Sequence, residues 1–207
     1  AVPATATLMN MYDTSEADLD IKVTGYQWKW QYEYLDEDIG FFSNLATPRD
    51  EISNEQIKNP HYLLEVDNPL VIPVNKKVRF LITANDVIHS WWVPHFAVKK
   101  DAIPGFINES WVKVEEPGVY RGQCTELCGK QHGFMPVVVE VKTEDDYAQW
   151  IEEQRSLKLA KAKKANVTLG VKYGLGKLIF EVNDIFALEA RYIELTSSGV
   201  GLFVQGK

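Results

Sequence analysis

The chain has 207 residues, of which 45% are hydrophobic and 12% are aromatic, and its formal net charge is −7. This length and composition indicate a globular chain with room for one substantial core and a small second unit. The acidic charge disfavours nucleic acid as a partner and favours a cationic one, and no apolar stretch approaches the roughly 20 residues of a membrane helix.

Residues 1–19 are predicted to form a polar linker. They also lack the basic start and apolar run of a signal peptide. Residues 20–142 contain short β-branched and aromatic segments separated by Gly, Pro and Asn turn signals. Such segments predict an antiparallel β-sandwich or barrel. They read "DIKVTGYQWKWQYEY", "HYLLEVD", "LVIPVNKKVRFLITA", "SWWVPHFAV", "SWVKVEE", "GVYRGQC" and "PVVVEVK".

Within the first of these segments, "GYQWKWQYEY" at residues 25–34 has an aromatic residue at every even position. Side chains alternate across a strand, so a single strand here would present one continuous aromatic face. That pattern predicts a core face, particularly for Trp30 and Tyr32.

Residues 143–165 are predicted to form a helix, because Thr143 is a suitable N-cap, acids follow it and basic residues gather towards the end. Residues 166–207 mix Gly-rich turns with apolar runs and carry no motif, so their structure is left open. Residues 155–180 contain only basic charges. We interpret this stretch as a solvated helix, with contacts to anionic lipid or another subunit as alternatives. Its charged residues are Arg155, Lys158, Lys161, Lys163, Lys164, Lys172 and Lys177.

The strongest chemical signal is "CTELCGKQHGFM", which places Cys124, Cys128, His132 and Met135 within twelve residues. A disulfide between cysteines so close in sequence closes almost no loop and stabilises little, so a chemical role is favoured. Soft sulfur ligands with imidazole favour copper. Zinc is the main rival, and Met135 has core packing as its alternative role.

Further histidines occur in "NDVIHSWWVPH", at the end of one predicted strand and the start of the next. Strand ends that are distant in sequence can meet in one loop cluster of a sandwich, which makes His89 a candidate ligand. A lone histidine is more often structural, and His61 is interpreted as a surface residue.

Several motifs together resemble subunit II of the bacterial haem-copper cytochrome c oxidases: "GYQWKWQYEY", "LLEVDNPLVIP", "DVIHSWWVP", "KKDAIPGFIN", "GVYRGQCTELCGKQHGFMP" and "VVVEV", in this order. The resemblance covers roughly residues 20–153. It implies an all-β, cupredoxin-like Greek-key barrel or sandwich over residues 20–142 that holds two copper ions in a binuclear CuA centre, followed by the C-terminal helix and the unassigned tail.

The resemblance also implies a ligand set. Cys124 and Cys128 would bridge the two coppers, His89 and His132 would each bind one, and Met135 and the main-chain carbonyl of Glu126 would be weak ligands. His95 is left out, because it falls where the family usually has a small residue.

For the Glu126 side chain, the resemblance implies a magnesium ion shared with oxidase subunit I, with a solvent-facing loop acid as the alternative. Nitrous oxide reductase also has a CuA centre, but an aromatic residue usually takes this position there. Glu126 therefore favours the oxidase.

The resemblance places Trp28 at the surface above the copper site, where it would accept electrons from cytochrome c. Acidic residues on the same side would dock the basic face of that protein, and association would weaken as salt rises. These residues are Glu33, Asp36, Asp67 and Asp86, with Glu37 and Asp38 in the same segments.

The implied function is the electron-transfer subunit of cytochrome c oxidase, which passes electrons to haem in subunit I for the reduction of oxygen to water. The isolated domain would carry electrons without reducing oxygen. The family's N-terminal membrane hairpin is absent from this sequence, so we expect an excised domain whose full-length protein is anchored at the periplasmic face of the bacterial inner membrane. No C-x-x-C-H motif for covalent haem is present.

Two alternatives remain. A mononuclear copper-delivery protein would bind one ion through the cysteines and a distant histidine. A quinol oxidase homologue would share the fold without the copper ligands, all of which this sequence retains.

Overall fold

The computed structural model describes residues 2–165, 169–174, 177–182, 185–190, 193–196 and 199–202, with side chains described as far as residue 160. The chain divides into two compact units, Ala1–Gln154 and Arg155–Lys207. Within the described residues, no helix has the length and apolarity needed to cross a membrane.

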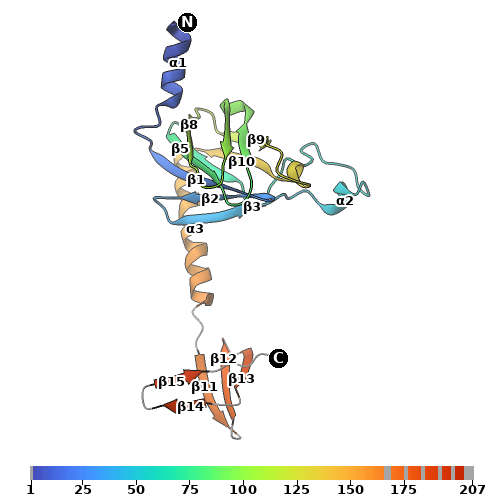
Figure 1. The fold of residues 1–207 in the computed structure, drawn as a ribbon, viewed down its shortest axis with the longest axis vertical. Helices are drawn as coiled ribbons and strands as arrows, with labels where there is room; N and C mark the ends of the chain where they lie inside the picture. The colour runs from blue at the N-terminus through green and yellow to red at the C-terminus, as the bar shows by residue number, and fades with distance from the viewer. Residues whose placement is uncertain are drawn as a thin grey trace. The chain divides into compact units, whose positions relative to one another are not determined.

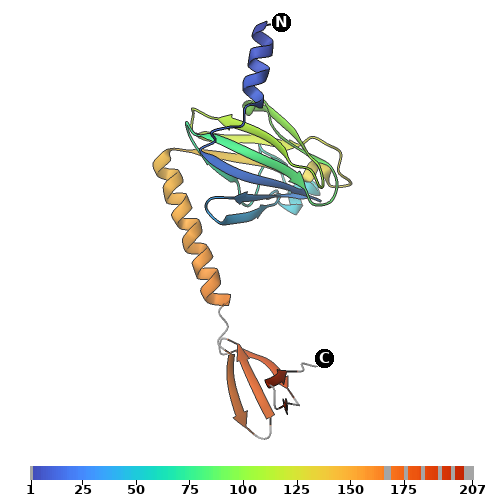
Figure 2. The same ribbon diagram turned by 60° about the vertical axis from the view of Figure 1, so that its left-hand side comes forward.

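Two five-stranded sheets form the first unit, and they lie against each other as two layers (Figure 1 and Figure 2). The first contains, in spatial order, β3 (Ile39–Ser43), β2 (Lys29–Tyr34), β1 (Leu19–Tyr26), β5 (Lys77–Ala84) and β8 (Asn108–Lys113). The second contains β4 (Leu70–Pro73), β10 (Pro136–Lys142), β9 (Gly118–Cys124), β6 (His89–Val93) and β7 (Val98–Ala102). Strand β1 runs parallel to β5 and β4 runs parallel to β10, whereas the other neighbours in these sheets are antiparallel. This architecture confirms the predicted β-sandwich.

The core lies between the sheets, and the period-two pattern of the sequence decides which side chains reach it. Strands β2 and β5 alternate strictly between half-buried and buried positions. Four large aromatic side chains are fully buried between the sheets: Trp30, Tyr32, Phe80 and Trp91. Full burial of a large apolar side chain contributes about 1.5–3 kcal/mol. These buried aromatic side chains therefore contribute much of the free energy that holds the two sheets together.

The segment 25–34 forms a hairpin and not the single strand that would present one continuous aromatic face. Strand β1 ends at Tyr26, Gln27 and Trp28 make the turn, and β2 begins at Lys29. Directly paired residues of antiparallel strands share a face, and Gly25 pairs with Trp30. The inward positions are therefore odd-numbered in β1 and even-numbered in β2. Trp30 is buried as predicted, but Trp28 lies in the turn.

Helix α1 (Val2–Tyr12) occupies a segment where the sequence predicts a polar linker. None of its residues is buried, and the sequence has no apolar stripe there that would have predicted a helix. Its Ala, Leu and Met residues favour a helix, and Pro3 falls in the first turn, where proline is tolerated. Helix α2 (Arg49–Ile52) and two 3₁₀ turns, η1 (Pro94–Phe96) and η2 (His132–Phe134), complete the helical elements of the first unit before α3.

Helix α3 (Glu144–Ala165) covers the residues predicted to be helical. The Thr143 hydroxyl accepts the Asp146 main-chain N–H at 3.2 Å, as expected for an N-cap. Tyr147, Trp150 and Ile151 pack against the core of the sandwich.

The second unit contains five strands. Three of them, β11 (Leu169–Gly174), β12 (Lys177–Val182) and β13 (Ile185–Ala190), form an antiparallel sheet. The other two, β14 (Ile193–Thr196) and β15 (Gly199–Leu202), form an antiparallel pair. The basic stretch 155–180 is therefore not one helix: α3 ends at Ala165, Lys172 lies in β11 and Lys177 begins β12, while the side chains of its basic residues beyond Lys158 lie outside the described residues.

Candidate metal centre

Two buried sulfur atoms form the middle of the site. Cys124 is the last residue of β9, and Cys128 lies in the loop that follows. Their Sγ atoms are 3.9 Å apart and both thiols are free. A disulfide has an S–S distance of about 2.05 Å. A metal ion about 2.3 Å from each sulfur, as in zinc thiolate sites, allows a separation of up to about 4.6 Å. The spacing therefore fits a metal that bridges both sulfurs.

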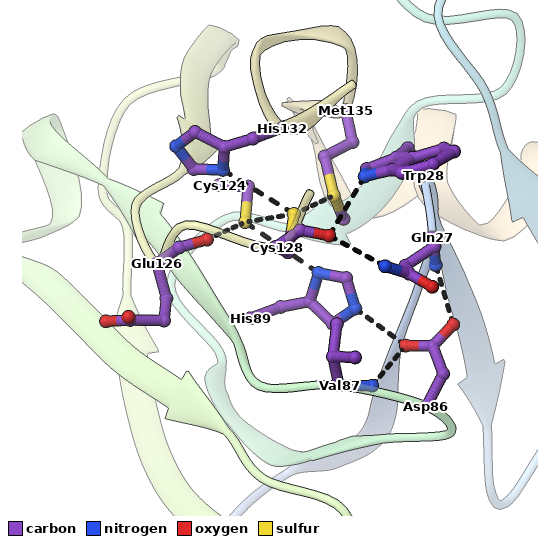
Figure 3. A network of polar contacts seen from close by, with 10 residues as sticks. All are labelled: Gln27, Trp28, Asp86, Val87, His89, Cys124, Glu126, Cys128, His132 and Met135. Carbon is purple, nitrogen blue, oxygen red and sulfur yellow. Dashed lines mark hydrogen bonds and ion pairs between the residues drawn. The ribbon is translucent and has the colours of Figure 1, made fainter. Parts of the chain in front are cut away.

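Four further donor atoms surround this pair (Figure 3). On the Cys124 side, His89 Nδ1 lies 3.9 Å and the Glu126 carbonyl oxygen 3.4 Å from the sulfur. On the Cys128 side, His132 Nδ1 lies at 3.5 Å and Met135 Sδ at 3.6 Å. The structure thus brings together all six predicted metal ligands.

The strands explain why these residues meet. His89 begins β6, whose Trp91 pairs with Cys124 of β9, and Met135 immediately precedes β10, which pairs with β9. Trp30 lies beneath the site, where its indole N–H donates to the Met135 carbonyl at 3.3 Å. The metal-binding loops are therefore held at one end of three adjacent strands.

The site is elongated. His89, Cys124 and Cys128 form a group whose donor atoms all lie within 4.8 Å of one another. His132 and Met135 approach instead from the Cys128 side. A single tetrahedral zinc ion would require its four donors to converge on one point. Donors spread around both sulfurs are better suited to two adjacent ions.

His89 is fully buried, and two contacts fix its ring. Its Nε2 lies 2.9 Å from Asp86 Oδ1. The main chain of Gly25 also lies close to the ring, because an added Cβ there would be 2.8 Å from His89 Cδ2. A side chain at position 25 would displace the ring, so glycine is required here for close approach.

Asp86 also accepts main-chain hydrogen bonds, from Gln27 at 2.8 Å and from Val87 at 2.7 Å. Burial acts to raise its pKa, but the contact with His89 and these two N–H groups outweigh burial and hold the pKa below its ordinary value. Asp86 is therefore an ionised carboxylate at neutral pH.

The β1–β2 turn also contacts the second metal-binding loop. The Gln27 side-chain amide donates to the Cys128 carbonyl at 2.8 Å, and the Trp28 indole N–H donates to the same oxygen at 3.1 Å. Gly129 makes room for the indole, since its φ is +117° and an added Cβ would lie 3.0 Å from Trp28 Cζ2. The half-buried Trp28 side chain thus connects the protein surface directly to a main-chain group of Cys128, a candidate ligand.

The pKa values of the two cysteine thiols are shifted in opposite directions. Burial disfavours the Cys124 thiolate, but contacts with His89 and neighbouring main-chain groups outweigh it and lower the pKa of that thiol. Burial, followed by the charge of Cys124, raises the pKa of Cys128. Burial acts to lower the pKa of His89, but Cys124 and Asp86 raise it on balance. A metal that binds both sulfurs must displace the Cys128 proton, so its affinity rises with pH.

The predicted docking acids are spread along the sandwich. Asp86 adjoins the site, and Asp67 bonds to the main-chain N–H of Asn44, next to the Ser43 that pairs with Trp30. Glu33 forms an ion pair with Lys22 at 2.9 Å, and Asp36 follows the other end of β2, about 20 Å along the strand from Trp28.

The remaining candidates lie outside the donor group. His95 is exposed in η1, with its ring 6.0 Å from that of Tyr120, and His61 is exposed in the loop after α2. The Glu126 side chain is exposed and points away from the sulfurs, although its carbonyl faces Cys124 (Figure 3). Sequence reasoning missed Gly25 and Gln27, because their contacts with the loops join segments distant in sequence.

Comparison with known proteins gives consistent matches. Residues 19–142 match the family described as cytochrome C oxidase subunit II, periplasmic domain. The chain is 51% identical over 152 residues to the probable cytochrome c oxidase subunit 2 of Rickettsia conorii, covering 73% of this chain and 47% of that protein. It is 44% identical over 161 residues to cytochrome c oxidase subunit 2 of Cereibacter sphaeroides, covering 72% and 53%. The chain spans about half the length of these curated relatives.

Among solved structures, the periplasmic domain of cytochrome oxidase subunit II (CoxB) of Bradyrhizobium japonicum is similar with a TM-score of 0.62 and 44% identity, covering 69% of this chain and 97% of that one. A subunit II domain in a mixed-disulfide intermediate with a thioredoxin-like protein is similar with a TM-score of 0.58 and 44% identity, covering 70% and 96%. These likenesses confirm the predicted cupredoxin-like fold.

Proposed function

We propose, because this chain belongs to the family of the cytochrome c oxidase subunit II periplasmic domain, that it holds a binuclear CuA centre. In this proposal the domain accepts single electrons from cytochrome c and passes them to haem in subunit I, where oxygen is reduced to water. It works at the periplasmic face of the bacterial inner membrane, as part of a membrane-anchored protein.

The distribution of donors around two sulfurs 3.9 Å apart carries this proposal. His89 and the Glu126 carbonyl lie by Cys124, while His132 and Met135 lie by Cys128. Two thiolates, two imidazoles and a thioether form a soft set that suits copper better than zinc. A mononuclear delivery site would leave His132 or His89 without a role.

Cys124, Cys128, His89, His132 and Met135 would hold the copper pair, which would supply one-electron redox chemistry. The residues of this chain supply a pocket that changes little when the electron arrives. Cys124, Cys128, His89 and Met135 are all at most 3% exposed, so water is largely excluded. The hydrogen bonds to His89 and to the Cys128 carbonyl hold the ligands in place and tune the metal.

The cytochrome c partner is supported by the position of Trp28 and by the acidic surface at the same end. The indole is half-buried and bonds to the Cys128 carbonyl, so it provides a short route from the surface to the site. Asp67 offers an exposed carboxylate nearby. Opposite charges on two partners raise the encounter rate more than the final affinity.

The rate of reduction by cytochrome c is therefore expected to fall steeply as ionic strength rises, because the Debye length shrinks to about 8–10 Å at physiological salt. Stopped-flow mixing over a salt series measures this. Asp67→Asn should flatten the dependence, whereas Glu115→Gln, an exposed acid in the loop at the opposite end of β9, should not. A reduction rate that does not change with ionic strength would contradict electrostatic docking of cytochrome c.

Glu126 is proposed to contact subunit I. Its carboxylate is exposed beside the site and points away from the sulfurs. A carboxylate oxygen is a preferred ligand of magnesium, which is bound through one or two carboxylates with several waters. We assign this side chain to a magnesium ion shared with subunit I.

Copper loading also requires reduced cysteines. A related subunit II domain was captured in a mixed disulfide with a thioredoxin-like protein. We include the same step here: a thiolate of such a reductant attacks one sulfur of a Cys124–Cys128 disulfide and forms a mixed disulfide, which a second thiol of the reductant then resolves. Two free thiols remain on this chain, and the reductant is oxidised to a disulfide.

A further inference from the structure

We propose that Asp86 is a positioning residue for His89, held in place by the β1–β2 turn. This inference deepens the proposed function and rests on it. Its basis is the set of three hydrogen bonds on one carboxylate: Oδ1 contacts His89 Nε2 and the Val87 N–H, and Oδ2 accepts the Gln27 N–H (Figure 3).

The contact with Asp86 decides which nitrogen of His89 faces the sulfurs. Both oxygens of Asp86 already accept main-chain N–H groups, from Gln27 and Val87, so the carboxylate acts as an acceptor and His89 Nε2 is the donor in their contact. Nδ1 is then the ring nitrogen that faces Cys124, 3.9 Å away, and the one available as a metal ligand. A carboxylate behind a metal-binding histidine both orients the ring and makes it a stronger donor.

The turn anchors this carboxylate on the same segment that touches the other metal-binding loop. The Gln27 main chain donates to Asp86, while the Gln27 and Trp28 side chains donate to the Cys128 carbonyl. One turn therefore fixes the His89 loop and the Cys128 loop relative to each other.

This arrangement assigns Asp86 a role other than docking. Its two oxygens already accept three hydrogen bonds within the domain, and its partner is a fully buried histidine. Asp67, in contrast, bonds only to Asn44 among the described contacts. The two residues are thus a matched pair for mutation. Both are aspartates at the same end of the sandwich, but only Asp86 contacts a candidate metal ligand.

The first test compares Asp86→Ala and Asp86→Asn with Asp67→Asn in the 207-residue chain loaded with copper. Loss of an outer partner of a metal ligand typically weakens affinity about 10- to 100-fold, and we expect this for Asp86→Ala in competition with a copper chelator. Asp86→Asn retains an oxygen for His89 but loses the charge and the Gln27 acceptor, so its loss should be smaller. Both variants should raise the reduction potential, whereas Asp67→Asn should match the unmodified chain in both measurements.

The second test uses the metal-free chain, so that it does not depend on the copper count. Nuclear magnetic resonance should show a slowly exchanging His89 Nε2 proton that is lost in Asp86→Ala and retained in Asp67→Asn. The inference is overturned if that proton persists in Asp86→Ala. It is also overturned if the Asp86 variants keep their copper affinity and potential and lose only the rate with cytochrome c.

Discussion

Replacing Cys128 by serine is expected to abolish the two-copper centre. The serine hydroxyl is a hard, protonated donor at neutral pH, whereas copper in this site requires soft thiolates. Cys128 also lies within 3.6 Å of the donor atoms of both His132 and Met135, so its loss separates these ligands from the bridge. The copper content should fall from two ions per chain to one or none, and the mixed-valence spectrum should disappear.

Cys124→Ser should have the same effect, because its sulfur faces His89 and the Glu126 carbonyl. Met135→Leu provides the control: it preserves the volume of a fully buried side chain but removes a weak ligand. That variant should keep both coppers with an altered potential. Two coppers with an unchanged spectrum in either serine variant would contradict a thiolate-bridged site.

Trp28→Ala is expected to leave the copper spectrum intact and to slow reduction by cytochrome c. The indole is half-buried at the surface and bonds to the Cys128 carbonyl at 3.1 Å, so its removal leaves a gap between the partner and the site. Small misplacements of reacting groups can slow a reaction on the order of 10²-fold, and we expect a loss of about this size from removal of the ring. Stopped-flow mixing with reduced cytochrome c measures the rate.

Two comparisons separate electron acceptance from general damage. Trp28→Phe keeps a ring but loses the hydrogen bond, so its rate should be intermediate. Trp111→Ala removes a half-buried tryptophan from β8 and should leave the rate unchanged. An unaltered rate in Trp28→Ala would show that electrons are accepted elsewhere.

The ligand set was accessible from the sequence because most of it is local. Cys124, Cys128, His132 and Met135 lie within twelve consecutive residues, and their spacing alone indicates a soft-metal site. His89 was only one candidate among several histidines until the family resemblance singled it out. The structure supplies the physical reason, since β6 pairs with β9 and places His89 beside Cys124.

Other features depend on contacts that no local pattern records. The aromatic residues of 25–34 suggested one strand, because alternation continues unbroken through the turn. The inward residues are odd-numbered at Ile21 and Val23 but even-numbered from Trp30 onwards. This switch from odd to even positions was the available sign of a hairpin. Of the partners of Asp86, Val87 and His89 are close in sequence, but Gln27 lies in the distant β1–β2 turn, so the acidic charge of Asp86 alone suggested a surface role.

The most direct test of the central claim is low-temperature electron paramagnetic resonance combined with copper counting on the chain reconstituted with Cu(II). Two ions per chain and a multi-line hyperfine pattern shared by two equivalent coppers are the predicted result. One ion with an ordinary four-line signal would contradict the binuclear centre and favour the copper-delivery function instead.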